Sequence, residues 1–423
     1  MTRRVAVVGA GWAGLAAGVA ATGAGHDVTV YEAARVPGGR ARTLQVKLAD
    51  GTQAALDNGQ HILIGAYLET LALMDRVGVA PQQALLRLPL VLRHPDGGGI
   101  ALPPWPSPLD AVAGILTARG WSWKDKASLL RAAAGWQLKG FRCAPQASVD
   151  DLCRSLTARI RAELVEPLCV AALNTPADRS SGQVFLRVLR DALFGRGHGS
   201  WGGSNLLLPR QPLGALFPEA AQAWLEARGA RVRLGARVQR IARDGIGWQV
   251  DDVPFDHVVL ACPPPQAARL ARAADTGEQW PALAEALAFE AITTVYVTGG
   301  PRLALPLLAL RCGPDAPAQF VFDRGQLGGP PGLLAFVVSA SGDDRDGIET
   351  RVLAQARALG YEVQLLQTVV EKRATFACTP GLRRPGIAIA PGLWACGDYV
   401  DGPYPATLEG AVRSGLDVAR QLG

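Results

Sequence analysis

The sequence predicts an α/β fold in which a Rossmann-like nucleotide-binding domain carries an inserted substrate domain of mixed sheet and helix. Three observations predict it. A short apolar run, Val5–Val8, ends at a glycine-rich loop and leads into a helix and a second strand. Buried strand patterns return at residues 230–262 and 392–398. From about residue 75 to residue 210 the chain loses this regularity and is rich in proline and tryptophan.

The first strand, helix and second strand form one β-α-β unit. Val5–Val8 is a continuous apolar run bounded by Gly9, which is typical of a buried parallel strand. Residues Trp12 to Ala24 are small and apolar, and we expect a helix that packs closely on that strand. Asp27–Glu32 is the second strand.

The middle of the chain has a different character. Leu102–Asp110 is proline-rich, which excludes a central strand or helix there. Two helical patterns follow, Trp121–Leu138 and Ser148–Leu168, and the second opens with Ser148 and Asp151 in a capping-box spacing. The sequence therefore predicts an inserted, mostly helical region with apolar walls, rich in the tryptophans Trp105, Trp121, Trp123, Trp136 and Trp201.

Strand patterns dominate the second half. Residues 230–262 predict a short meander that ends in a buried strand, and residues 290–380 predict more sheet. We expect a discontinuous nucleotide-binding domain made of residues 1–75, 214–270 and 385–423. Residues 76–213 and 271–384 would then form the substrate domain.

Composition limits the class of protein. The 423 residues are 49% apolar and 19% charged, which is enough for a substantial core. The net charge of +6 is compatible with an ordinary solvated surface. A more specific interpretation is weak attraction to an anionic membrane. No dense basic run with interleaved aromatic residues argues for nucleic acid. Seven scattered cysteines without a Cys-x-x-Cys pair argue against a disulfide framework or a metal site.

The N-terminal pair Arg3-Arg4 precedes an apolar run and resembles an export signal. That run contains the complete glycine loop, which cleavage would remove, so we reject export. No apolar run reaches the ~18–20 residues that a membrane span needs. We therefore expect a cytoplasmic protein, with peripheral contact at the inner membrane face left open.

The loop Gly9-x-Gly11-x-x-Gly14 predicts a dinucleotide site, because a strand precedes it and a helix follows. Gly9 permits the tight turn, Gly11 lets the backbone approach a pyrophosphate, and Gly14 lets helix and strand pack closely. The helix N-terminus favours the anion. Glu32, at the end of the second strand, is expected to accept hydrogen bonds from ribose hydroxyls.

A second glycine-rich turn follows that strand. Gly38 and Gly39 allow close approach of the backbone to a ligand, and Arg40 and Arg42 offer bidentate contacts to phosphate. The alternative is a solvated basic turn, which would not need two adjacent glycines.

These motifs, together with Gly397-Asp398 and a C-terminal small-residue helix, resemble the FAD-dependent amine oxidase and carotenoid desaturase superfamily, whose fold is of the GR2 flavoprotein type. The resemblance runs the full length and implies that both chain ends build one FAD site. It implies that Gly397 and Asp398 meet the ribityl and phosphate region, and that the helix N-terminus, near Thr407 and Leu408, points at the flavin. It also implies that the backbone of Val238 meets the adenine.

Two further stretches, Leu56–Tyr67 and Val165–Pro176, resemble the hydroxysqualene dehydroxylase group within that superfamily. The resemblance implies reductive loss of a hydroxyl from a C30 isoprenoid, giving squalene for hopanoid synthesis. The partners implied are a long apolar isoprenoid and an electron donor that the sequence does not identify, an NADPH-linked one being an option. Such a lipid favours membrane contact, for which residues 104–142 are our candidate, with core and lid packing as the alternative.

Hydroxide is a poor leaving group, so the departing oxygen needs a proton or strong hydrogen bonds. The candidate donors are His61, Asp57 and Tyr404. For His61 the alternative is a satisfied core histidine, and for Asp57 it is a carboxylate that holds loop N–H groups. Aromatic and apolar walls would suit the isoprenoid and a cation formed from it.

Three other functions are compatible with these motifs. A desaturase would take hydride from a C30 or C40 isoprenoid, and an amine oxidase would be reduced by an amine. A lipid carrier of the same fold would bind isoprenoid without redox chemistry, as GDP-dissociation inhibitors do. Intact flavin motifs at both ends of the chain speak against the carrier.

Overall fold

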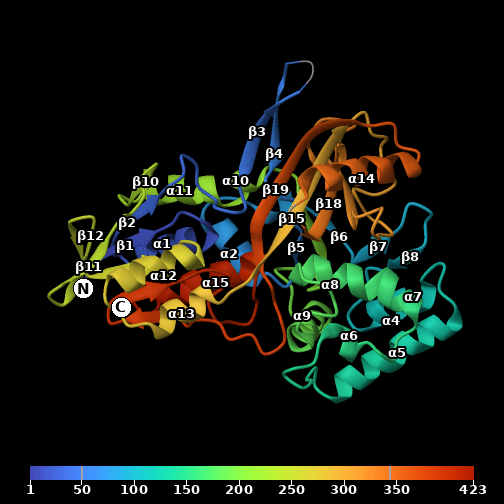
Figure 1. The fold of residues 1–423 in the computed structure, drawn as a ribbon, viewed down its shortest axis with the longest axis horizontal. Helices are drawn as coiled ribbons and strands as arrows, with labels where there is room; N and C mark the ends of the chain where they lie inside the picture. The colour runs from blue at the N-terminus through green and yellow to red at the C-terminus, as the bar shows by residue number, and fades with distance from the viewer. Residues whose placement is uncertain (49–50, 343) are drawn as a thin grey trace.

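The computed structural model describes residues 1–48, 51–342 and 344–423. A parallel sheet and both termini lie at one end of the molecule, and an antiparallel sheet and a group of helices lie at the other (Figure 1). Across these described residues, no helix is both long and apolar enough to cross a lipid bilayer.

The parallel sheet joins distant parts of the chain. Its order is β10-β2-β1-β14-β21-β20, and every neighbouring pair is parallel except β20–β21. The N-terminal β1 and the C-terminal β21 both flank β14, so the two chain ends share one sheet. The bounds are β1 Arg4–Val8, β2 Asp27–Glu32, β10 Arg231–Leu234, β14 His257–Leu260, β20 Ala388–Ala390 and β21 Leu393–Ala395.

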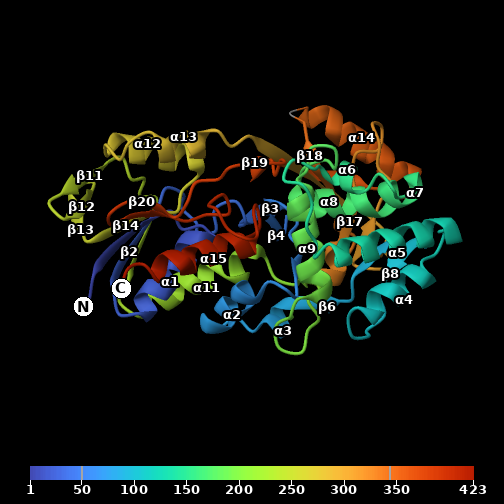
Figure 2. The ribbon, with the colours of Figure 1, turned by 90° about the horizontal axis from the view of Figure 1, so that it is seen from below.

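Helix α1 (Trp12–Gly23) covers this sheet and packs against α15 (Leu408–Ala419) and α11 (Pro218–Glu226) (Figure 2). The approach of α15 is close enough to need glycine. A Cβ added at Gly415 would lie 2.3 Å from the carbonyl oxygen of Ala13. The expected helices at both ends of the chain are confirmed, and they contact each other.

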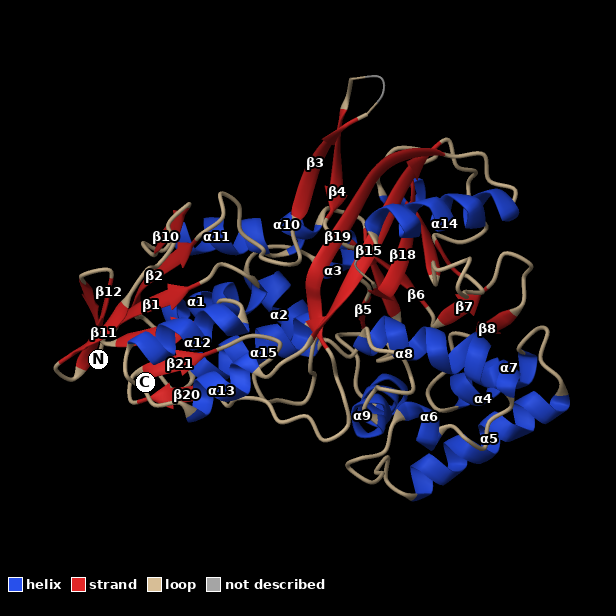
Figure 3. Ribbon diagram, viewed as in Figure 1, coloured by secondary structure: helices blue, strands red, loops and turns tan. Residues whose placement is uncertain are grey.

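The second sheet is antiparallel, in the order β16-β17-β18-β15-β19. Figure 3 shows its strands β18, β15 and β19 side by side. The long strands β15 and β19 pair along most of their length, and α14 packs over the apolar face that includes Val295 and Phe336. The bounds are β15 Phe289–Thr298, β16 Leu307–Ala309, β17 Phe320–Asp323, β18 Leu334–Ser341, β19 Gln364–Phe376 and α14 Arg345–Ala358.

Smaller elements connect the two sheets. The strand pairs β3–β4 and β7–β8 are hairpins, and β9 lies between β5 and β6. The bounds are β3 Thr43–Lys47, β4 Gln53–Asp57, β5 Leu63–Ile64, α2 Leu68–Arg76, α3 Pro81–Ala84, β6 Leu85–Leu88, β7 Val91–Arg93, β8 Gly99–Ala101, β9 Leu206–Pro209, α10 Leu213–Leu216, α12 Pro264–Ala273 and α13 Gln279–Glu285.

The inserted region is helical, as expected, but its second helical pattern is broken into short pieces. The capping box at its start is confirmed: Asp151 N–H donates to Ser148 Oγ (3.0 Å), and Ser148 N–H donates to Asp151 Oδ2 (3.1 Å). A new N-cap at Thr157 then restarts the helix. The bounds are α4 Leu109–Thr117, α5 Trp123–Leu138, α6 Val149–Leu152, α7 Ala158–Ile160, a π-turn Arg161–Val165, α8 Glu166–Leu173 and α9 Gly182–Phe194.

The expected meander over residues 230–262 is wrong in part. Only β11 (Ile241–Asp244), β12 (Gly247–Val250) and β13 (Val253–Phe255) form an antiparallel meander. Strand β10 instead pairs in parallel with β2, about 200 residues earlier, and β14 pairs in parallel with β1. Parallel pairing depends on distant partners, so local alternation of residues does not distinguish it from a hairpin.

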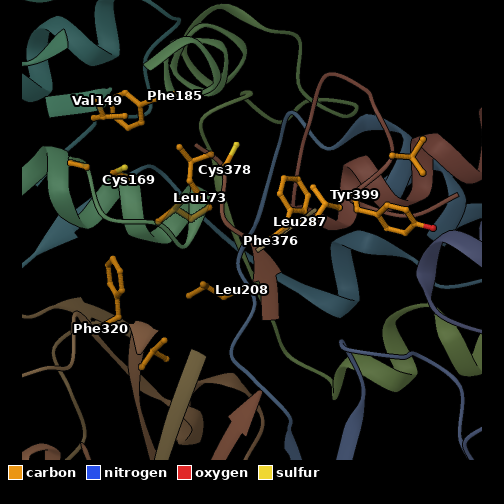
Figure 4. Close-up of a cluster of buried hydrophobic side chains, with 14 of the residues drawn as sticks. Val149, Cys169, Leu173, Phe185, Leu208, Leu287, Phe320, Phe376, Cys378 and Tyr399 are labelled. Atoms are coloured by element: carbon orange, nitrogen blue, oxygen red, sulfur yellow. The ribbon is translucent and has the colours of Figure 1, made fainter. Parts of the chain in front are cut away.

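A continuous apolar core links the helices to both sheets (Figure 4). It contains Phe185 and Leu173 from the helices, Phe320 and Phe376 from the antiparallel sheet, and Tyr399 from the loop after β21. These side chains are almost fully buried, so the helices, the antiparallel sheet and the loop after β21 share one packed core.

Candidate functional site

A cavity of about 970 Å³ lies between the two sheets. One part is lined by residues that follow the carboxyl ends of β1, β2, β14 and β21. Ligands of open α/β sheets bind at this edge, where the strand order reverses. The cavity therefore lies at the edge of the sheet where the sequence pattern predicts a ligand, and binding of a cofactor there stays a prediction.

Twelve of the thirteen residues expected to bind the cofactor line this cavity. They come from both ends and the middle of the chain, and they are Gly9, Gly11, Glu32, Gly38, Gly39, Arg40, Arg42, Val238, Gly397, Asp398, Thr407 and Leu408. Gly14 is the exception. A Cβ there would lie 1.9 Å from the carbonyl oxygen of Gly9, so Gly14 serves the packing of loop on helix.

The glycine loop presents open backbone to the cavity. A Cβ added at Gly11 would meet no atom within 4 Å, and Gly11 pairs with Gly38 in a parallel bridge. Gly9 has a φ of 119°, which L side chains rarely adopt. No described side chain caps the N-terminus of α1. Its free N–H groups and the space beside Gly11 fit the pyrophosphate of a dinucleotide.

Glu32 fixes the loop and faces the same cavity. One carboxylate oxygen accepts from Ala10 N–H and the other from Ala34 N–H, both at 2.8 Å. Each oxygen keeps a further lone pair. The residue can therefore hold the loop and still accept from a ribose hydroxyl, as expected of an acid at the end of the second strand.

The two arginines of the second glycine turn have protein partners. Arg40 donates to the carbonyl of Ala374 (2.9 Å) and forms an ion pair with Asp398. Arg42 Nη1 donates to the carbonyl of Gly39 (2.7 Å). Both line the cavity, and contact of either with phosphate stays a prediction.

The C-terminal segment closes the same site. Thr407 caps α15, with Oγ1 accepting from Gly410 N–H at 2.9 Å, and it lines the cavity with Leu408. Glu409, which is fully buried, accepts from the N–H groups of Glu69 (3.1 Å) and Thr70 (2.9 Å). It thereby joins the start of α2 to α15, whose first residues line the cavity.

His61 lines the cavity from the segment after β4. Its Nδ1 lies 3.0 Å from the carbonyl oxygen of Gly59, which can only accept, so Nδ1 carries the proton. Burial lowers the pKa of His61, and this outweighs the opposite effect of the Gly59 carbonyl. The imidazole is therefore neutral at pH 7, with Nε2 unprotonated.

Tyr404 lines the cavity beside α9. Its hydroxyl donates to Asp191 Oδ2 (2.9 Å), and Arg187 Nε also donates to that oxygen (2.8 Å). Arg413 lies 5.0 Å from the centroid of the Tyr404 ring. Burial, and next the hydrogen bond to Asp191, raise the pKa of Tyr404. The phenol thus stays protonated and oriented.

Asp57 is buried, and it does not belong to the residues that line the cavity. Its Oδ1 accepts from the N–H of Leu213 (2.8 Å), the first residue of α10. Burial raises the pKa of Asp57 to about 6. This geometry matches the alternative stated for Asp57, a carboxylate that holds backbone N–H groups. A catalytic role for it stays a prediction.

The cavity continues into an apolar arm that the motifs did not reveal. Asn174, which ends α8, is held within it: Nδ2 donates to Thr375 Oγ1 (3.0 Å), and Oδ1 accepts from Ala340 N–H (2.7 Å). The apolar walls come from α8, α9 and the strands β7, β16, β17 and β18, and include Leu92, Leu168, Val170, Phe185, Leu189, Leu193, Leu307, Phe320, Phe322 and Val337.

The sequence analysis also did not single out several other residues that line the cavity. Cys262 follows the carboxyl end of β14, and burial raises its pKa to about 12. Tyr399 follows Asp398, and its buried hydroxyl has no hydrogen-bond partner among the described residues. The position after a buried parallel strand would have indicated both. Glu371 and Arg373 of β19 carry no such local signal.

The family profile of flavin-containing amine oxidoreductases matches residues 12–423. A hydroxysqualene dehydroxylase from Rhodopseudomonas palustris is 30% identical over 444 residues, which cover 98% of this chain and 97% of the relative. One from Sinorhizobium fredii is 29% identical over the same length and the same shares of both chains.

Solved structures share the fold. An oxidoreductase from Methanosarcina mazei matches with a TM-score of 0.73 at 17% identity, covering 99% of this chain and 100% of that one. Putrescine oxidase bound to putrescine matches with a TM-score of 0.66 at 19% identity, covering 100% and 99%. With the glycine loop, Glu32 and the C-terminal segment around one cavity, these matches lead to one conclusion. The chain belongs to the flavin-containing amine oxidoreductase family and is an FAD-dependent oxidoreductase.

Proposed function

We propose that the protein removes the hydroxyl group of hydroxysqualene reductively, giving squalene and water. The observation that carries this proposal is the apolar arm, which continues from the cofactor residues into the space between α8, α9 and the antiparallel sheet. Such walls suit a long hydrocarbon chain. The names of the full-length relatives support the same substrate class.

In the proposed reaction a carbon–oxygen bond breaks and a carbon–hydrogen bond forms, and the oxygen leaves as water after gaining a proton. Bound FAD in its reduced form supplies the hydride. The electrons reach FAD from a separate reductant, for which an NADPH-linked donor is our expectation. The chain contributes orientation, exclusion of water and a hydrogen-bond donor to the departing oxygen.

His61 and Tyr404 are the proposed donors, because both line the cavity. Tyr404 keeps its proton at neutral pH, and its single O–H must turn from Asp191 toward the departing oxygen to donate. His61 must first gain a proton at Nε2, which its lowered pKa opposes. Near neutral pH, Tyr404 is therefore the more available donor, and His61 contributes chiefly in acid.

An anaerobic experiment tests the proposal. The FAD-loaded protein is reduced with dithionite, hydroxysqualene is added, and the visible flavin band is followed while products are extracted. We expect reoxidation of the flavin together with squalene in equal amounts. A flavin that stays reduced, without squalene, would contradict the proposal. Oxidised protein is then offered saturated isoprenoids and amines, which separate a desaturase from an amine oxidase.

A further inference from the structure

We propose that the protein docks on an anionic phospholipid membrane through the α4–α5 face, formed by Trp105, Leu109, Val112, Leu116 and Trp123. The inference deepens the proposed function, since a long isoprenoid resides in a membrane. Its main test needs no turnover, so its failure can be distinguished from failure of the proposed reaction.

Exposed apolar side chains are concentrated at this face. Eleven large apolar side chains are exposed in the described part of the chain, and five of them form this face. Trp123 is 74% exposed, Leu109 is 62% exposed and Trp105 is 58% exposed. A clustered set of this kind marks an interaction surface, whereas single exposed apolar residues do not.

The face is continuous. Leu109, Val112 and Leu116 have the spacing of one side of a helix, and the opposite side of α4 is buried. The Nζ of Lys126 donates to the carbonyl of Leu116 (2.8 Å) and lies 5.0 Å from the centroid of the Trp123 ring. The side of α4 and the start of α5 therefore form one surface.

The charge around this face selects an anionic partner. Residues 103–142 contain two acidic side chains, Asp110 and Asp125, and both are buried. All other charged side chains there are basic and lie at least partly exposed: Arg119, Lys124, Lys126, Arg131, Lys139 and Arg142. Basic side chains beside apolar ones, with tryptophan among them, are typical of helices that lie in the surface of a membrane. Two copies of such a face would repel each other.

Two of the four tryptophans in the expected contact segment do not belong to this face. Trp121 is buried, and its Nε1 donates to Glu163 Oε2 (3.0 Å). Trp136 packs against the core. Core packing therefore accounts for Trp121 and Trp136. Trp105 and Trp123 are exposed in the described part of the chain, and core packing does not account for them.

The face adjoins the wall of the apolar arm. The hydroxyl of Ser107, between Trp105 and Leu109, donates to the backbone carbonyl of Leu193, which lines the cavity. Helices α4 and α5 lie at the opposite end of the molecule from the two termini (Figure 2). Docking at this end would bring the lipid surface next to the part of the cavity that is built for a hydrocarbon chain.

Vesicle flotation of the FAD-loaded protein tests the proposal. Vesicles of phosphatidylcholine with phosphatidylglycerol are compared with vesicles of phosphatidylcholine alone. We expect binding to the anionic vesicles, and at least about a tenfold loss for the triple variant Trp105→Ala, Leu109→Ser, Trp123→Ala. The matched control is Ile246→Ser, because Ile246 is 99% exposed in the turn between β11 and β12, far from α4. This variant should bind as the parent does.

Three outcomes would overturn the proposal: no binding by the parent, undiminished binding by the triple variant, or an equal loss in the Ile246→Ser control. A concentration-dependent dimer that the triple variant abolishes would also overturn it, in favour of a self-contact. None of the substituted residues lines the cavity. Turnover of detergent-dispersed substrate should therefore be unchanged, while turnover of vesicle-embedded substrate falls with binding.

Discussion

Arg40 and Asp398 form an ion pair although 358 residues separate them in the sequence. Arg40 also donates to the carbonyl of Ala374 in β19, so one side chain joins the loop after β2, the antiparallel sheet and the loop after β21. Burial opposes the charge of Arg40, but the adjacent carboxylate outweighs burial and raises its pKa. The chain ends are thus tied together where FAD is expected to bind.

Replacing Asp398 with asparagine should therefore weaken both folding and FAD binding. The Asp398 side chain is 8% exposed and that of Arg40 is 36% exposed, so the change leaves a poorly solvated cation without its partner. We expect a loss of about 2 kcal/mol in the free energy of unfolding, less than for a fully buried pair because water screens Arg40 in part. Chemical unfolding of the FAD-free protein measures this loss, and FAD titration measures the affinity.

The matched control for Asp398→Asn is Asp417→Asn, which breaks the pair Arg420–Asp417 with side chains 64% and 50% exposed. Its cost should be below about 0.5 kcal/mol. Equal losses for the two variants would show that the Arg40–Asp398 pair contributes no more than a surface contact.

Gly11→Ala should fold normally and lose FAD. The added methyl meets no protein atom within 4 Å, and the φ of −75° suits alanine. It occupies the space expected to hold the pyrophosphate, so we expect at least about a tenfold weaker affinity for FAD. Visible absorbance of the purified protein and FAD titration measure it, with Gly135→Ala in α5 as control. Parent-like affinity would remove Gly11 from the cofactor site.

Gly14→Ala should instead destabilise the fold, because its Cβ would lie 1.9 Å from a backbone oxygen. Backbone must move to relieve that contact, which costs more than about 2 kcal/mol. Thermal unfolding measures the effect. A Tm equal to that of the parent would contradict the packing role assigned to Gly14.

The grouping of most expected cofactor residues around one cavity was predictable, because their signals are local. Gly9, Gly11 and Gly14 follow a spacing set by the backbone needs of any dinucleotide loop, and carboxyl ends of parallel strands share one edge. Partners of the charged groups were not predictable in the same way. Asp57 is paired with Leu213, 156 residues later, and Arg40 with Asp398. The residue types suggested chemistry, while long-range folding supplied their contacts.

The apolar arm was predictable in character but not in position. Its walls depend on β15 pairing with both β18 and β19, and on the packing of α8 and α9 over that sheet. Strand β10 is a second case in which a local pattern did not identify the partner. Its alternation of residues suited an antiparallel meander, but it pairs in parallel with β2. Composition predicts apolar walls, whereas topology decides which apolar residues face a ligand.

His61→Ala should retain FAD and slow turnover of hydroxysqualene, most strongly at acid pH. The pKa of His61 is lowered, so its cation, the form that donates from Nε2, accumulates only below its ordinary pKa of 6.5. The parent's turnover should therefore rise as pH falls toward 5, and the variant should lack that rise. His257→Ala is the control, since His257 does not line the cavity. Unchanged turnover in the variant would remove His61 from the mechanism.

Tyr404→Phe should keep the packing of the ring and lose the hydrogen bond to Asp191. Asp191 retains Arg187 and Arg190 as donors, so we expect only about 1 kcal/mol of destabilisation. Turnover near pH 7 should fall by roughly ten- to a hundredfold if this hydroxyl protonates or binds the departing oxygen. The matched control is Tyr361→Phe, which lies outside the cavity lining. Full activity of Tyr404→Phe would exclude this hydroxyl as the donor.

The free energy of unfolding of Asp57→Asn, measured relative to that of the parent, should increase as pH rises from about 4 to 6. Burial raises the pKa of Asp57 from 3.8 to about 6, so within this window the folded parent retains a proton that the unfolded chain has released. The parent's free energy of unfolding therefore falls with rising pH by about 3 kcal/mol from this group. Asparagine keeps an acceptor for the N–H of Leu213 and cannot ionise. Chemical unfolding of both proteins from pH 4 to 7 measures the difference, which should grow up to about pH 6 and then stay constant. A difference independent of pH would show that the Asp57 carboxyl carries no burial penalty in the folded state.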